Sequence, residues 1–169
     1  MNMRLKSVIF SLLIAVSAMA ATAYSIYPTP RNMALMGSTI NLGTKVNIVT
    51  SDASAKYVDR LKEVLEGAGL SYTVSAEAAQ GMVDVYIGEY GTEDVADTYS
   101  KLLSGVNTSI FPATTDRYDP HILRIDTDSD RGTILLLGDT DGSAYYACAS
   151  LEQMLEQNMN EGMQSLSGM

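Results

Sequence analysis

The chain has 169 residues and a formal charge of −9 at pH 7, with 20 acidic against 11 basic side chains, a single cysteine and no tryptophan. The acidic excess is spread along the sequence and argues against nucleic acid and anionic membrane surfaces as partners, because phosphate groups are bound by Lys and Arg. One cysteine cannot form a disulfide within the chain, so an apolar core must hold the fold together.

The first 23 residues show the three-part pattern of a cleavable signal peptide. Arg4 and Lys6 give a short positive region, and residues 8–16 form an apolar run that is too short to span a bilayer comfortably. Small residues then offer cleavage sites after Ala20 or Ala23. We therefore expect residues 1–23 to be removed from a chain that is secreted or periplasmic and has no membrane anchor. Cleavage would change the formal charge from −9 to about −11.

Removing the signal leaves about 146–149 residues, the size of one ordinary domain. In this part of the chain, alternating apolar residues predict strands, and apolar residues spaced three or four apart predict helices. Residues 134–137 form an unbroken apolar run, which is typical of a central strand buried on both faces. In chain order we expect strands at 39–42 and 45–50, a helix at 54–67, strands at 71–75 and 83–88, a helix at 92–104, strands at 121–126 and 133–138, and a helix at about 143–157.

This order of elements predicts an α/β (α+β) sandwich, in which a mixed sheet of about five or six strands is covered by two or three helices. Residues 128–132 lie between two predicted strands and indicate a hairpin connection, whereas residues 105–120 are expected to form a surface loop. The domain is expected to span residues 24–157. Residues 158–169 have neither helix caps nor periodicity, and we expect them to fray.

Two motifs resemble ligand-binding loops, but a hairpin turn explains the first better and a helix cap explains the second better. Residues 126–130 place carboxylates at alternate positions, as a calcium loop does, but Arg131 occupies the position that needs glycine. Residues 138–143 lead from a strand into a helix, where phosphate loops occur, but contain no lysine. We expect Asp141 or Ser143 to cap that helix instead.

His121 and Cys148 are the only histidine and cysteine, so no further residue of either type supports a nucleophile and base pair or a zinc site. Cys148 stands between two alanines and is expected to pack as a small apolar side chain. His121 follows Asp119 and Pro120 at the start of a strand and is expected at the surface. We therefore expect no catalytic, cofactor-binding or metal-binding residue in this chain.

Two motifs at the ends of the predicted domain carry a resemblance to a known family. One is Tyr-Pro-Thr-Pro at residues 27–30, just after the signal. The other is the turn at residues 139–147, which leads into Ser-Leu-Glu-Gln-Met at residues 150–154. With these motifs, residues 26–155 resemble the small N-terminal domain of secreted β-N-acetylglucosaminidases and hexosaminidases. This is the 20b-type domain of glycoside hydrolase families 84 and 20, as in bacterial hyaluronidase-like enzymes, and the motifs do not separate the two families.

The resemblance implies a non-catalytic accessory domain that packs in cis against a catalytic (β/α)8 barrel. In these families two consecutive aspartates, or an Asp-Glu pair, on the barrel carry out the hydrolysis of glycans, and this chain contains neither Asp-Asp nor Asp-Glu. No catalytic residue, metal or cofactor is therefore carried over. The barrel is expected to be absent, which would make the chain a fragment or a free-standing copy of the accessory domain.

Two alternatives remain open. An independent hydrolase is disfavoured by the missing carboxylate pair. A free-standing secreted glycan-binding module would need a groove lined by aromatic side chains, and in the absence of tryptophan the tyrosines would have to supply it. The candidate side chains are Tyr86, Tyr90, Tyr99, Tyr118, Tyr145 and Tyr146.

Overall fold

The computed structural model describes residues 24–30, 32–34, 39–92, 102–106, 108, 111, 119–127, 131–160 and 165–167. Its strands and helices follow the predicted order closely. They are β1 (Thr39–Asn41), β2 (Lys45–Val49), α1 (Lys56–Gly67), β3 (Ser71–Ser75), β4 (Val83–Glu89), β5 (His121–Asp126), β6 (Thr133–Gly138), α3 (Asp141–Asn160) and β7 (Ser165–Ser167).

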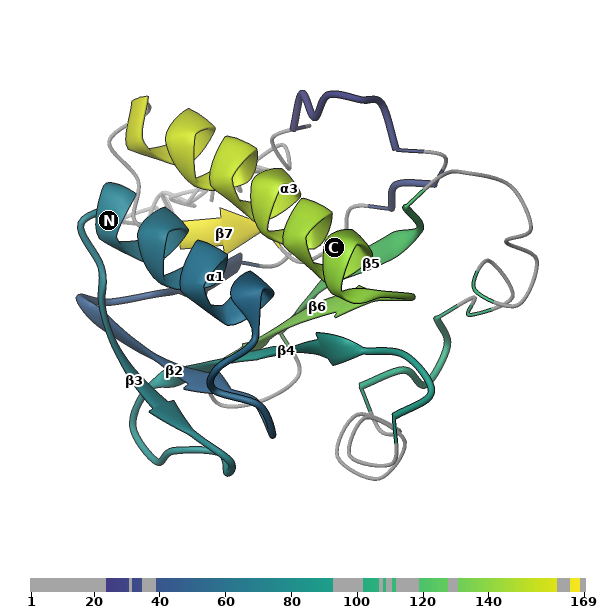
Figure 1. Ribbon diagram of the computed structural model, residues 1–169. Coiled ribbons are helices and arrows are strands. Elements are labelled where there is room, and N and C mark those ends of the chain that lie inside the picture. The colour runs from purple at the N-terminus through teal and green to yellow at the C-terminus, as the bar shows by residue number, and fades with distance from the viewer. Residues whose placement is uncertain are drawn as a thin grey trace, which may run out of the picture.

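Five of the strands form one mixed sheet in the order β3-β2-β4-β6-β5. The first four strands run parallel to one another, and β5 pairs antiparallel with β6. Helices α1 and α3 lie side by side on one face of this sheet (Figure 1). This architecture confirms the predicted α/β sandwich. The antiparallel pairing of β5 with β6 agrees with the predicted hairpin, although residues 128–130 lie outside the described part.

The apolar spacing of α1 explains how the helix layer packs on the sheet. Its buried side chains are spaced three or four apart, so they share the face that turns toward the strands. The helix ends before Gly69, whose φ of +72° favours glycine and lets the Leu70 N–H reach the Leu65 carbonyl at 2.9 Å. The buried side chains are Tyr57, Val58, Leu61, Val64 and Leu65.

The central strand β6 is buried on both faces, as its unbroken apolar run predicts. Ile134 and Leu136 belong to the core beneath the helices, and Leu135 and Leu137 belong to a second cluster on the opposite face. Phe111 is buried in that second cluster, against which Leu102, Leu103, Tyr86 and Ile122 also pack. The predicted helix at 92–104 falls mostly on residues 93–101, which lie outside the described part of the chain.

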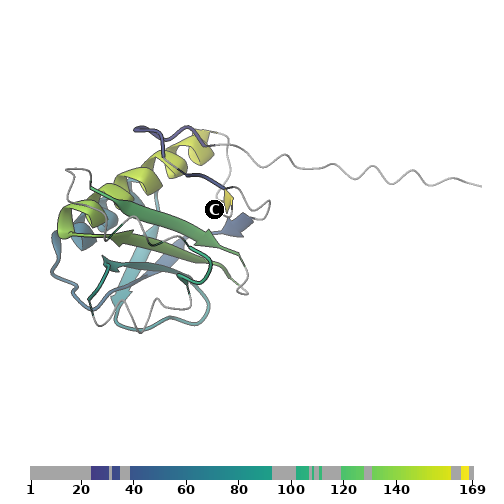
Figure 2. The same ribbon diagram turned by 90° about the vertical axis from the view of Figure 1, so that its right-hand side faces the viewer.

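The C-terminal segment differs from the expectation that it frays from residue 158. Helix α3 continues to Asn160, and β7 pairs antiparallel with β1, placing Leu166 opposite Ile40. Figure 2 shows the yellow β7 beside the blue β1. The Leu166 side chain is fully buried in the main core. A three-residue strand is too short to show a periodic pattern of apolar residues in the sequence. It is stabilised by pairing with a strand that is far away along the chain.

Candidate functional site

Residues 24–30, here called the strap, run along α3 on the side away from α1 (Figures 1 and 2). The Gln153 carboxamide accepts the Tyr27 N–H at 2.7 Å and donates to the Tyr27 carbonyl at 2.9 Å. Gln157 repeats the pattern on Ser25, at 2.8 and 3.0 Å. Alternate residues of an extended segment are thus matched to glutamines four apart on a helix, which lie on one face.

The same alternation gives the strap one buried and one exposed side. Tyr24 and Ile26 point into the core and are almost fully buried. The Tyr24 hydroxyl accepts a hydrogen bond from Asn158 of α3 at 3.2 Å. Tyr27 points outward and is 84% exposed. The two sequence motifs at the ends of the domain are therefore in direct contact, because Gln153 belongs to the second and Tyr27 to the first.

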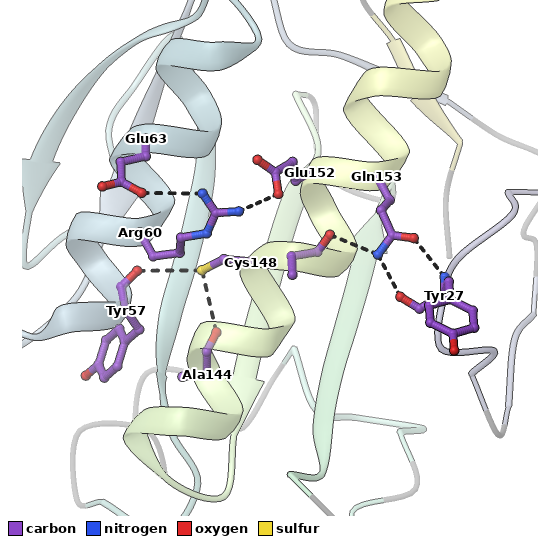
Figure 3. A network of polar contacts seen from close by, with 9 residues as sticks. Tyr27, Tyr57, Arg60, Glu63, Ala144, Cys148, Glu152 and Gln153 are labelled. Atoms are coloured by element: carbon purple, nitrogen blue, oxygen red, sulfur yellow. Dashed lines mark hydrogen bonds and ion pairs between the residues drawn. The ribbon is translucent and has the colours of Figure 1, made fainter.

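On its other side, α3 is joined to α1 by a charged cluster (Figure 3). The Arg60 guanidinium lies between Glu63 at 3.4 Å and Glu152, with which it forms an ion pair. It also lies over the ring of Tyr145, 5.7 Å from the ring centroid. The Arg60 side chain is 18% exposed, so this cluster is held partly out of water.

Cys148 and His121 have separate partners. Cys148 is buried between the helices, with Sγ 3.6 Å from the Tyr57 carbonyl and 3.5 Å from the Ala144 carbonyl (Figure 3). Burial raises the pKa of its thiol to about 12, so the thiolate needed for nucleophilic chemistry is scarce at neutral pH. The His121 ring bridges Ser150 Oγ, 3.0 Å from Nε2, and the Asp119 carbonyl, 3.2 Å from Nδ1. His121 is half-buried rather than a surface residue, because α3 covers it.

Three carboxylates gather where the parallel strands end. Asp52 follows β2, Glu89 ends β4, and Asp141 follows β6. Burial raises the pKa of Glu89, and the negative charges of Asp141 and Asp52 raise it further. The pKa of Tyr57 is raised by burial and by the same carboxylates. The sequence pattern missed this group, because its members are far apart along the chain and meet only through the strand order.

This carboxylate group lies where open α/β sheets commonly bind ligands, outside the carboxyl ends of the strands. Within the described part of the chain, however, no three His, Cys, Asp or Glu side chains are placed to hold a metal ion.

The described helices also include none that is long and apolar enough to cross a membrane.

The turn from β6 into α3 forms a helix cap, not a phosphate site. Thr140 is the capping residue, because its Oγ1 accepts the Ser143 N–H at 3.2 Å. The prediction of Asp141 or Ser143 as the cap is wrong, since α3 begins earlier than expected, at Asp141. Gly138 permits the close approach of strand and helix, because a Cβ there would lie 2.0 Å from the Ala144 nitrogen.

The candidate sugar-binding tyrosines are dispersed. Tyr86 packs in the second cluster, and Tyr90 stacks on Phe111 with ring centroids 4.5 Å apart. Tyr145 and Tyr146 are 44% and 50% exposed on α3, in an edge-to-face pair 6.4 Å apart. Tyr99 and Tyr118 lie outside the described residues.

An open cleft of about 590 Å³ lies elsewhere, between β1 and the segments that precede β2, β4 and β6. Its described lining contains no aromatic side chain, so it lacks the stacking surface that sugar rings prefer. The lining residues are Thr39, Ile40, Asn41, Leu42, Gly43, Thr44, Lys45, Gly81, Met82, Val83, Thr127, Arg131 and Gly132.

The sequence and the fold both match known proteins. The family model described as glycosyl hydrolase family 20, domain 2, matches residues 23–167. The solved structure of CpGH84D is similar over 86% of this chain, with a TM-score of 0.72 and 28% identity. CpGH84B shares the fold over 86% of the chain, with a TM-score of 0.58 and 18% identity. The chain covers only 23% and 22% of those two proteins. No curated protein matches it. The family resemblance drawn from the end motifs is thereby confirmed.

Proposed function

Because the chain belongs to the family described as glycosyl hydrolase family 20, domain 2, we propose that it is the non-catalytic N-terminal accessory domain of a secreted β-N-acetylhexosaminidase or β-N-acetylglucosaminidase that acts on glycans. The observation that carries the proposal is the match of 86% of this chain to 23% of a much longer protein, CpGH84D. The chain would pack in cis against a (β/α)8 catalytic barrel, and export would depend on the signal sequence at residues 1–23.

The assignment of chemistry to the barrel is supported by the carboxylates of this chain. Hydrolysis assisted by the acetamido group of the substrate needs a positioned pair of carboxyl side chains, and the sequence contains neither Asp-Asp nor Asp-Glu. The gathered carboxylates come from three separate places in the fold: Asp52 follows β2, Glu89 ends β4, and Asp141 begins α3. Of these, Glu89 is the side chain whose raised pKa would suit a general acid.

An assay of the intact chain with a chromogenic N-acetyl-β-glucosaminide tests this division of labour. We expect release of the chromophore no faster than in buffer. Release that is lost in Glu89→Gln and retained in Glu77→Gln, which changes an exposed glutamate after β3, would overturn the proposal and make the chain a hydrolase.

A glycan-binding module is the alternative function, and two observations weigh against it. The cleft has no aromatic lining among the described residues. The tyrosine candidates Tyr86 and Tyr90 are engaged with other side chains on the far face of the sheet. Titration of the chain with chitin oligomers and with hyaluronan, followed by calorimetry, is expected to give no saturable binding. A saturable isotherm that is lost in Tyr146→Ser would favour the module.

A further inference from the structure

The open cleft beside β1 has no part in the proposed function. It has a volume of about 590 Å³, within the range of about 300–1,000 Å³ that is typical of small-molecule sites. We propose that this cleft binds a tetrahedral oxyanion, a sulfate or phosphate group, between the side chains of Lys45 and Arg131. Such a site does not depend on a catalytic barrel, since both cations belong to this chain.

The two basic side chains of the cleft have no carboxylate partner in the described part of the chain. Arg60, Lys62 and Arg124 each form an ion pair with an acidic side chain. Lys45 and Arg131 form no ion pair with the described residues, and both line the cleft. The described lining also contains no Asp or Glu. An anion is therefore the ligand whose charge fits this cleft.

The strand order brings these two cations to the same edge of the sheet. Lys45 is the first residue of β2, and Arg131 lies two residues before the start of β6. Both strands are parallel neighbours of β4, so their starting ends lie at one edge. Two strand spacings separate β2 from β6 by about 9–10 Å. Long Lys and Arg side chains can therefore reach one ligand from its two sides.

The Arg131 guanidinium is already oriented by the backbone. Its Nη1 donates to the Gly81 carbonyl at 2.8 Å, in the segment that precedes β4. Within the described structure, Nε and Nη2 have no acceptor, and these two atoms form the edge that binds an oxyanion through two parallel hydrogen bonds. A guanidinium that is held before binding loses less entropy when the ligand arrives. Lys45 adds a point charge with three N–H donors.

The described carboxylates nearest to this edge are bound by other groups. Asp84 in β4 accepts hydrogen bonds from Asn47 Nδ2 at 2.8 Å and from the Ala79 N–H at 3.0 Å. Asp126, at the end of β5, pairs with Arg124 at 3.6 Å. Neither carboxylate forms an ion pair with the two cations of the cleft. The described acidic side chains therefore leave both cations available to a ligand.

The geometry of the two cations favours a tetrahedral group over a carboxylate. A planar carboxylate can be satisfied by the arginine fork alone. A sulfate or phosphate group presents oxygens in several directions, so it can bind Arg131 on one side and Lys45 on the other. The charge of a phosphate group, about −1.5 to −2 at neutral pH, also matches two cations. An unsulfated acidic polymer such as hyaluronan therefore fits the cleft less well.

Two sources present such a group, the free inorganic ion and an ester carried on a saccharide. The exposed side chains of Thr39, Asn41 and Thr44 line the cleft and offer hydroxyl and amide groups. These groups can hydrogen-bond to the hydroxyl groups of a sugar, although the described lining has no aromatic ring on which a sugar could stack. We therefore expect the saccharide ester to bind more tightly than the free ion.

Calorimetric titration of the intact chain tests the site. The probes are N-acetylglucosamine 6-sulfate, inorganic sulfate, inorganic phosphate and unmodified N-acetylglucosamine, at a constant ionic strength set with sodium chloride. We expect saturable binding of the oxyanions and none of the uncharged sugar. Tighter binding of the sugar sulfate than of inorganic sulfate assigns the source to a saccharide, and equal binding assigns it to the free ion.

Substitutions then locate the binding. Lys45→Met and Arg131→Met should each weaken it by about tenfold or more, because each removes charge-assisted hydrogen bonds. Arg131→Lys keeps the charge but loses the fork, so its affinity should lie between those of the parent and Arg131→Met. Lys56→Met is the matched control and should bind as the parent does. Lys56 is exposed and has no ion pair in the described part, but it begins α1, which follows the other end of β2.

Lys45→Met keeps the test valid, because it changes an exposed side chain that has no hydrogen bond in the described part, and urea unfolding checks that it folds. Absence of saturable oxyanion binding, or equal weakening in Lys56→Met, would overturn the proposal. Asp128 and Asp130 precede Arg131 in the sequence and lie outside the described residues. Binding that appears only after both are changed to Asn would mean that the chain's own carboxylates occupy the cations, and would also overturn it. The chromogenic assay of the proposed function is unaffected by either result.

Discussion

The single carboxamide of Gln153 satisfies both backbone polar groups of Tyr27, through contacts of 2.7 and 2.9 Å (Figure 3). A β-strand would satisfy these groups with a neighbouring backbone, but here a helix side chain takes that role. The strap is thereby attached to α3 rather than to the sheet. This gives a structural reason for the two end motifs to occur together, since each holds one half of the contact.

Replacement of Gln153 should loosen the strap. Gln153→Leu removes the protein partner of the Tyr27 N–H and carbonyl. Because both hydrogen bonds are exposed and water can replace the partner, the cost is about 0.5–1.5 kcal/mol in the free energy of unfolding for each bond. Gln153→Glu should also destabilise the protein, because a carboxylate can accept the N–H but cannot donate to the carbonyl. Urea unfolding measures both changes. Glu156→Ala, an exposed change on the same helix, is the control, and equal losses in all three variants would contradict this account.

Gly138 and Gly142 form a matched pair for testing the turn into α3. Gly138→Ala should destabilise the fold by about 1–3 kcal/mol or more, because its Cβ would lie 2.0 Å from the backbone nitrogen of Ala144. In Gly142→Ala the new Cβ would lie 3.8 Å from Asp119 Oδ1 and from Thr140 Oγ1, an ordinary van der Waals distance, in the first turn of the helix. It should therefore be neutral or stabilising, because alanine is the better helix former.

Thermal unfolding midpoints of Gly138→Ala and Gly142→Ala, measured side by side, test this predicted difference in stability. Equal midpoints for the two variants would show that β6 and α3 can separate at little cost, contrary to the close approach described here.

A substitution at Leu166 tests whether β7, the last described strand, contributes to the stability of the fold. Because its side chain is fully buried opposite Ile40, Leu166→Ala should lower the free energy of unfolding by about 2–5 kcal/mol. Met33→Ala, at a position that is 39% exposed, is the control and should change little. If denaturant titration gives the same midpoint for both variants, then β7 is not part of the cooperative fold.

The contrast between β6 and β7 shows which features a single sequence can predict. The alternation and apolar runs of residues 83–88 and 133–138 are local, and the strands occur where these patterns lie. The pairing of Leu166 with Ile40 has no local pattern, because three residues cannot show a period and the partner strand is distant. The frayed tail expected for residues 158–169 therefore differs from the observed strand.

In the candidate site, too, local sequence patterns could be predicted but contacts between distant residues could not. Gln153 and Tyr27 each belong to a sequence motif, but the contact between them cannot be predicted from the sequence, since a helix side chain can reach many segments. The grouping of Asp52, Glu89 and Asp141 could not be predicted, because only the strand order brings them to one edge of the sheet. His121 was expected at the surface because the sequence does not show that Ser150 of α3 lies above it.

His121 gives the domain a pH dependence whose sign follows from its burial. Burial is the largest influence on its pKa and lowers it below the ordinary 6.5, although the hydrogen bond and the charge of Asp119 act in the opposite direction. The unfolded chain therefore binds a proton at this residue more readily than the folded chain does. The stabilising contribution is present above about pH 6.5 and is lost as the pH falls through the lowered value.

The measurement compares urea unfolding of the parent chain and His121→Gln between pH 7.5 and pH 5. Other groups, including Glu89 with its raised pKa, titrate in both proteins, so the difference between the two curves isolates His121. We expect the stability of the parent to fall relative to the variant as the pH decreases below about 6.5, because glutamine does not titrate. A parent that gains stability relative to His121→Gln on acidification would mean that the Asp119 charge outweighs burial, and the half-buried neutral ring beneath Ser150 would be the wrong description.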